Sequence, residues 1–93
     1  MFVGTLQVTL HLEQTFSLKD KRRVVKSLMA KLQNDFNISI AEIDHQDEHR
    51  MAALGMAIVA NDGRFTQQVV DRIVSRLEGH PDVMLEDWQS EVI

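Results

Sequence analysis

The chain has 93 residues, contains no cysteine and carries a net charge of −4, with ten lysine and arginine residues against fourteen acidic residues. This length predicts one domain over residues 1–93, and the absence of thiols excludes disulfides, thiolate metal sites and a cysteine nucleophile. No uncharged run is long enough to span a membrane and no basic residue precedes the first apolar segment, so we expect a cytoplasmic protein with no membrane partner.

The first half of the chain predicts a strand followed by a helix. Apolar and polar side chains alternate over residues 2–13, which indicates a strand with one buried face. The period then changes, and apolar residues recur at helical spacing over residues 18–35. Ser17 is a good N-cap for this helix, and Asp20 stands at the capping-box position.

The second half predicts a hairpin, a helix and a last strand. Residues 38–43 are rich in isoleucine and residues 51–60 form a second apolar run, so we expect two strands joined by a polar loop over residues 44–50. An aspartate caps the next helix, and a glycine and a proline end it, within residues 62–81. Residues 83–92 predict the last strand.

This order of elements predicts a ferredoxin-like α+β sandwich. Two βαβ halves with right-handed crossovers form a four-stranded antiparallel sheet with both helices on one face. No internal repeat, low-complexity stretch or linker interrupts this order.

The charge is unevenly distributed along the chain. Residues 17–31 carry six basic residues and one acid, a net charge of +5, so the rest of the chain carries −9. The cations crowd the first turns of a predicted helix, where the macrodipole is already positive and stability alone would favour acids. A phosphate or an RNA backbone docking at this end would explain the placement. The predicted anion-contact residues are Lys19, Lys21, Arg22, Arg23 and Lys26.

Two other interpretations of this basic segment stay open. It can be an ordinary solvated face, with Glu86 or Asp87 of the last strand as an intramolecular partner. It can also dock an acidic protein. Composition does not choose between these and an anion site.

The polar loop between the predicted hairpin strands is the second candidate site. Two histidines and three acids fall within residues 44–49, and imidazole with carboxylate suits zinc, nickel or iron. A polar loop held by Asx turns accounts for the same residues, so we predict no metal and no cofactor. We expect a contact with RNA or protein instead. The predicted loop-contact residues are Asp44, His45, Gln46 and Asp47.

The chain lacks the sequence motifs that are typical of several classes of function. The chain has no glycine-rich phosphate loop, no nucleophile elbow and no tyrosine, so we expect neither an enzyme nor a small-molecule substrate. The predicted outward face of the sheet has no aromatic residue on which bases could stack, in contrast to an RNA-recognition motif. Its small side chains suit packing against a second copy, to which Trp88 could contribute.

Two longer segments carry a family resemblance. These are the run from Ser17 to Leu28 and the segment from Phe36 to Asp47, with shorter matches at Leu54-Gly55, Asp71–Val74 and His80-Pro81. Over nearly its whole length the chain resembles the YlxP-like proteins, a small bacterial family with a domain of unknown function. The resemblance implies a ferredoxin-like fold, no assigned enzyme activity, and a role near translation or ribosome assembly, since such genes often lie among those for these processes.

Three hypotheses follow for the function. The first is a non-enzymatic accessory protein that binds ribosomal RNA or a ribosome-associated protein through the basic helix and the adjacent loop. The second is a homodimeric module that binds protein, or regulates it, through its sheet. The third is a metal-dependent enzyme centred on Asp44, His45 and Asp47.

Overall fold

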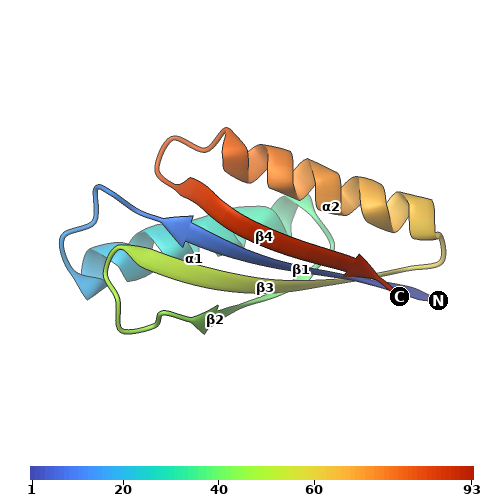
Figure 1. Ribbon diagram of the computed structural model, residues 1–93, viewed down its shortest axis with the longest axis horizontal. Coiled ribbons are helices and arrows are strands. Elements are labelled where there is room, and N and C mark those ends of the chain that lie inside the picture. The colour runs from blue at the N-terminus through green and yellow to red at the C-terminus, as the bar shows by residue number, and fades with distance from the viewer.

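Two helices and four strands follow one another in the predicted order (Figure 1). The computed structural model describes residues 1–93. The elements are β1 (Phe2–His11), α1 (Leu18–Asp35), β2 (Ser39–Asp44), β3 (Met51–Ala60), α2 (Gly63–Glu78) and β4 (Met84–Val92). β1 ends two residues before the predicted boundary, because the chain turns at Glu13 and Gln14 on its way to α1.

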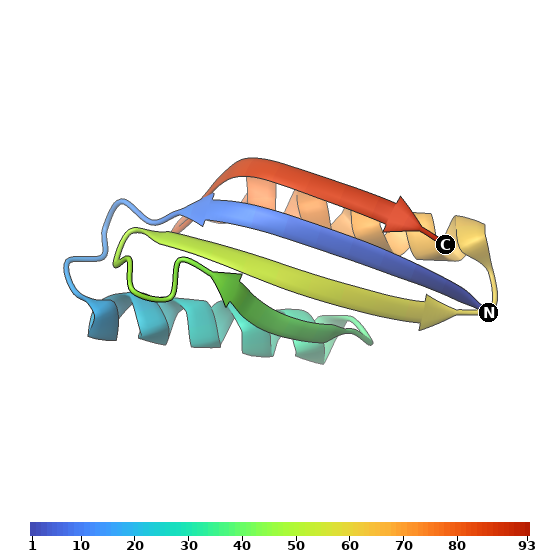
Figure 2. The ribbon, with the colours of Figure 1, turned by 60° about the horizontal axis from the view of Figure 1, so that its bottom comes forward.

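The four strands form one antiparallel sheet in the order β2-β3-β1-β4. Both helices lie on the same side of it, with α1 along the β2 edge and α2 along β1 and β4 (Figure 2). This arrangement confirms the predicted ferredoxin-like sandwich. Neither helix is both long and apolar enough to cross a membrane.

The core lies between the sheet and the helices. Leu6, Val8 and Leu10 of β1 alternate with partly exposed polar residues and are at most 1% exposed. Each apolar residue pairs across the sheet with β3 and faces the helices, as the alternation predicts. The outer face of the sheet therefore keeps the small and polar side chains of the odd-numbered β1 positions.

Local signals begin both helices where the sequence predicts. The Ser17 hydroxyl accepts a hydrogen bond from the Asp20 amide at 3.1 Å, and the Asp62 carboxylate accepts from the amides of Arg64 and Phe65. These bonds satisfy amides that the helices leave without an intrahelical partner.

Candidate functional site

Four of the five predicted anion-contact residues are exposed in the N-terminal half of α1. Only Arg23 has an acidic partner: its Nη2 lies 2.9 Å from Oδ1 of Asp20. The alternative in which Glu86 or Asp87 neutralises this surface is wrong, since no ion pair joins them and β4 lies at the far edge of the sheet from β2. We call the four residues the α1 basic surface: Lys19, Arg22, Arg23 and Lys26.

The fold also separates charge between its layers. The two helices carry nine of the ten lysine and arginine residues but four of the fourteen acidic residues, a net charge of +5. The strands and loops carry the remaining basic residue with ten acids, a net charge of −9. A polyanion is therefore attracted to the helical side and repelled by the rest of the molecule.

Lys21 is buried, unlike the other four cations, so its prediction as an anion contact is wrong. Its side chain is fully buried and continues the buried stripe formed by Val25, Leu28 and Leu32 of α1. A helix repeats every 3.6 residues, so Lys21 shares the face of Val25 and not that of Arg22. A phosphate on the surface cannot reach a side chain enclosed in this way.

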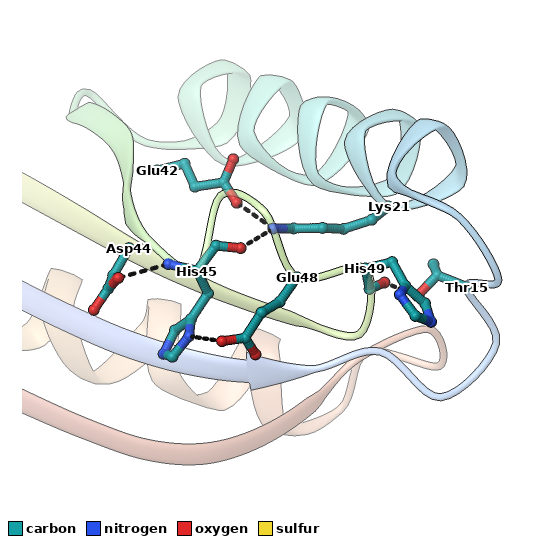
Figure 3. A network of polar contacts seen from close by, with 7 residues as sticks. All are labelled: Thr15, Lys21, Glu42, Asp44, His45, Glu48 and His49. Atoms are coloured by element: carbon teal, nitrogen blue, oxygen red, sulfur yellow. Dashed lines mark hydrogen bonds and ion pairs between the residues drawn. The ribbon is translucent and has the colours of Figure 1, made fainter.

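The Lys21 ammonium is neutralised inside the fold (Figure 3). Its Nζ lies 2.7 Å from Oε2 of Glu42 on β2 and donates to the backbone carbonyl of His45 at 2.6 Å. Oε2 is itself buried, with no other partner. A buried charge needs such a partner, because losing water without one costs several kcal/mol. The pair thus joins the start of α1 to the end of β2.

Asp44 and His45 shape the loop that follows β2. The Asp44 carboxylate accepts a hydrogen bond from the His45 amide at 2.7 Å, and His45 adopts the left-handed conformation with φ 61°. The His45 carbonyl, which accepts from Lys21, also accepts from the Glu48 amide at 3.1 Å. Two of the predicted loop-contact residues are therefore held by internal bonds, whereas Gln46 and Asp47 are exposed.

The imidazole of His45 meets the carboxylate of Glu48, with Nδ1 3.0 Å from Oε1 (Figure 3). This hydrogen bond raises the pKa of His45 above its ordinary 6.5, against a smaller opposing effect of desolvation. Because the pKa is raised in the folded state, the contact stabilises the fold below about pH 6.5. That contribution is lost as the pH rises through the folded-state pKa.

Replacing Glu48 with glutamine is expected to lower the pKa of His45 towards its ordinary value. An NMR titration of the His45 ring measures this directly. Asp47→Asn is the matched control, since it removes an acid from the same loop that does not contribute to the raised pKa of His45. An unchanged His45 titration in Glu48→Gln would show that the carboxylate does not set it.

A second set of contacts clamps this loop to the segment between β1 and α1. The Leu12 amide donates to the Arg50 carbonyl at 2.8 Å, and Arg50 Nε donates to the Thr15 carbonyl at 3.4 Å. The buried Thr15 hydroxyl lies within hydrogen-bond distance of the carbonyls of Leu12 and His49. None of Thr15, Glu42 and Arg50 was among the residues predicted from the sequence.

The histidine and acidic side chains of the loop do not gather at one place in the structure. No three His, Asp or Glu side chains in the chain converge as metal ligands. The His45 ring is instead hydrogen-bonded to the Glu48 carboxylate. The hypothesis of a metal-dependent enzyme therefore has no ligand set to support it.

Two comparisons with known proteins agree with the predicted resemblance. A family model described as "Protein of unknown function (DUF503)" matches residues 3–90. A curated relative, the uncharacterized protein YlxP of Bacillus subtilis (strain 168), is 34% identical over 67 residues, which make up 72% of this chain and 73% of the relative. The two segments that carry the resemblance supply both sides of the Lys21–Glu42 ion pair.

Proposed function

We propose that this chain, which belongs to the DUF503 family of proteins of unknown function, is a non-enzymatic accessory protein that binds ribosomal RNA through α1. The observation that supports this most is the α1 basic surface. Three of its four cations have no acidic partner within the chain. Cations at the positive end of a helix disfavour folding slightly, so a bound polyanion accounts for them better than stability does.

The separation of charge between the helices and the rest of the chain indicates from which side RNA would approach. RNA carries a dense row of phosphates, and it approaches the helical side because the sheet and loops are acidic. The exposed Gln46 and Asp47 follow His45, whose carbonyl is bonded to Lys21 of α1, so they border the proposed interface. The resemblance, which implies a role near translation, favours ribosomal RNA over other polyanions.

Sedimentation with ribosomal subunits on a sucrose gradient, at low and at high salt, tests this function. We expect the protein to sediment with a subunit at low salt and to dissociate at high salt, because phosphate contacts release counterions. Free protein at both salt concentrations would overturn ribosomal RNA as the partner.

Reversing the charge of Arg22 and Arg23 together is expected to weaken binding roughly tenfold and to lower the slope of log affinity against log salt by about 1.5. Two phosphate contacts are lost in this variant. Titration of a labelled ribosomal RNA fragment at several salt concentrations gives both quantities. Arg64→Glu with Arg72→Glu is the matched control, since both residues are exposed on α2 and the net charge changes equally. Equal losses in the two variants would mean that only net charge matters.

The homodimer hypothesis is supported by the outer face of the sheet. Ile43 and Val59 are exposed there beside Ala57, and Ile43 lies against Gly55, so this part of the face is flat and apolar. A second copy could bury it. Analytical ultracentrifugation at micromolar concentration tests this, and a monomer would count against it.

Trp88 does not contribute to that outer face. It pairs directly with Val8 of β1, whose side chain is in the core, so the tryptophan belongs to the helix side of the sheet. The proposed dimer surface is therefore made by β2 and β3 without it.

A further inference from the structure

Phe16 exposes an aromatic ring beside the α1 basic surface. Phe16 is 73% exposed and directly precedes Ser17, the N-cap of α1. An apolar residue at this position commonly packs on the fourth residue of the helix as a hydrophobic staple. Here that fourth residue is Lys21, whose side chain runs inward to Glu42. The position where a staple partner would stand is therefore occupied by a charged residue and not by an apolar one.

Neighbouring contacts hold Phe16 in this exposed position. The guanidinium of Arg50 lies 5.6 Å from the ring centroid, and its Nε donates to the carbonyl of Thr15. The Phe16 amide donates to the carboxylate of Asp20 at 3.4 Å. The segment is thus attached both to α1 and to the loop before β3. Such attachment reduces the conformational entropy lost when a ligand binds the ring.

The surroundings of the ring indicate which ligand it suits. The residues around Phe16 in the chain, Glu13, Gln14 and Ser17, are exposed and polar, and the one side chain known to contact the ring is the cationic Arg50. The cations of the α1 basic surface begin one turn further along the helix. A nucleotide combines a flat aromatic base with a negative phosphate, and each base has a face that can stack on an aromatic side chain.

We propose that Phe16 is a stacking platform for an unpaired base of RNA, which stacks on the ring face opposite Arg50, with phosphates of the same strand on Lys19 and Arg22. This inference rests on the proposed function and adds the substrate class, which is RNA with a single-stranded segment. The outer sheet face, where an RNA-recognition motif stacks bases, has no part in it.

Binding of a single-stranded RNA and of a blunt RNA duplex of the same length tests the inference. The bases of the duplex are stacked and paired, so it offers only phosphates to the protein. For Phe16→Ala we expect about tenfold weaker binding of the single strand and unchanged binding of the duplex. A 2-aminopurine placed in the single strand reports stacking by a change in its fluorescence, which Phe16→Ala should abolish and Phe16→Trp should keep.

Phe65→Ala is the matched control, because Phe65 is also exposed, at 53%, but lies on α2. It should bind both RNAs as the wild type does. Unchanged single-strand affinity in Phe16→Ala, or an equal loss for both RNAs, would overturn the stacking role and leave the proposed function intact. Wild-type protein that binds neither RNA would overturn the proposed function itself. Single-strand binding that depends on Arg22 and Arg23 but not on Phe16 would likewise overturn the stacking role, because the RNA would then contact only the cations.

Discussion

Replacing Lys21 with methionine is expected to lower the free energy of unfolding by about 3 kcal/mol. The substitution removes the ion pair with Glu42 and the hydrogen bond to the His45 carbonyl. It also leaves the Glu42 carboxylate, only 21% exposed, without its cation. That remaining exposure is the reason to expect the lower end of the range for broken buried pairs. Urea denaturation followed by circular dichroism measures the change.

The double variant Lys21→Met with Glu42→Leu is expected to recover most of this loss, because replacing a whole buried pair by apolar residues is often neutral or stabilising. Lys26→Met serves as the control on the same helix. Its side chain is exposed, so the change should stay within about 0.5 kcal/mol. If Lys21→Met were as stable as the wild type, the ion pair would contribute nothing to the fold.

The same variants separate folding from RNA binding. Lys21→Met should lose stability but keep RNA affinity at temperatures where it is folded, since the ammonium does not reach the surface. Reversing Arg22 should do the opposite. These results would show that the buried cation of α1 serves stability and that its exposed cations serve the proposed RNA binding.

Replacing Gly4 with alanine is expected to cost about 2 kcal/mol through overpacking. A Cβ at this position would lie 2.5 Å from Cγ2 of Thr66, where α2 crosses β1 closely. Thr66 cannot move away freely, because it is fully buried and its hydroxyl donates to the Asp62 carbonyl at 2.9 Å. Thermal and urea unfolding measure the cost.

A second substitution identifies the clash behind this cost. Thr66→Ser removes Cγ2 and keeps the hydroxyl, so Gly4→Ala should be better tolerated in that background. Gly79→Ala is the control, since the nearest atom to its Cβ is 3.6 Å away and no clash arises. Additive effects of Gly4→Ala and Thr66→Ser would contradict the proposed contact.

Much of the fold could be predicted because its signals are local. The alternation in β1 and the helical spacing in α1 each follow from how a side chain points relative to its neighbours in the chain. Ser17 and Asp62 begin their helices through bonds to amides within three residues. The order of strands and helices is compatible with only a few sheet topologies, and the structure has the ferredoxin-like one.

The candidate site was only partly predictable. The exposed cations of α1 follow from helical phase, and the same phase places Lys21 with Val25 on the buried face. The prediction for Lys21 was wrong because it followed the general expectation that a charged side chain lies at the surface. What makes its burial tolerable is Glu42, which comes from another strand and becomes its neighbour only in the folded chain.

The types of the elements, their order and the exposed basic surface could thus be predicted, since they depend on the pattern of side chains within a few residues of the chain. The tertiary structure decided that Lys21 is neutralised, that His45 turns through a left-handed conformation, and that Arg50 lies over Phe16. The Lys21–Glu42 ion pair and the Arg50–Phe16 contact each join residues far apart in the sequence. The carbonyl of His45 accepts a hydrogen bond from Lys21, which belongs to another element. Their energies arise only when the loop before β3 and the start of α1 meet in space.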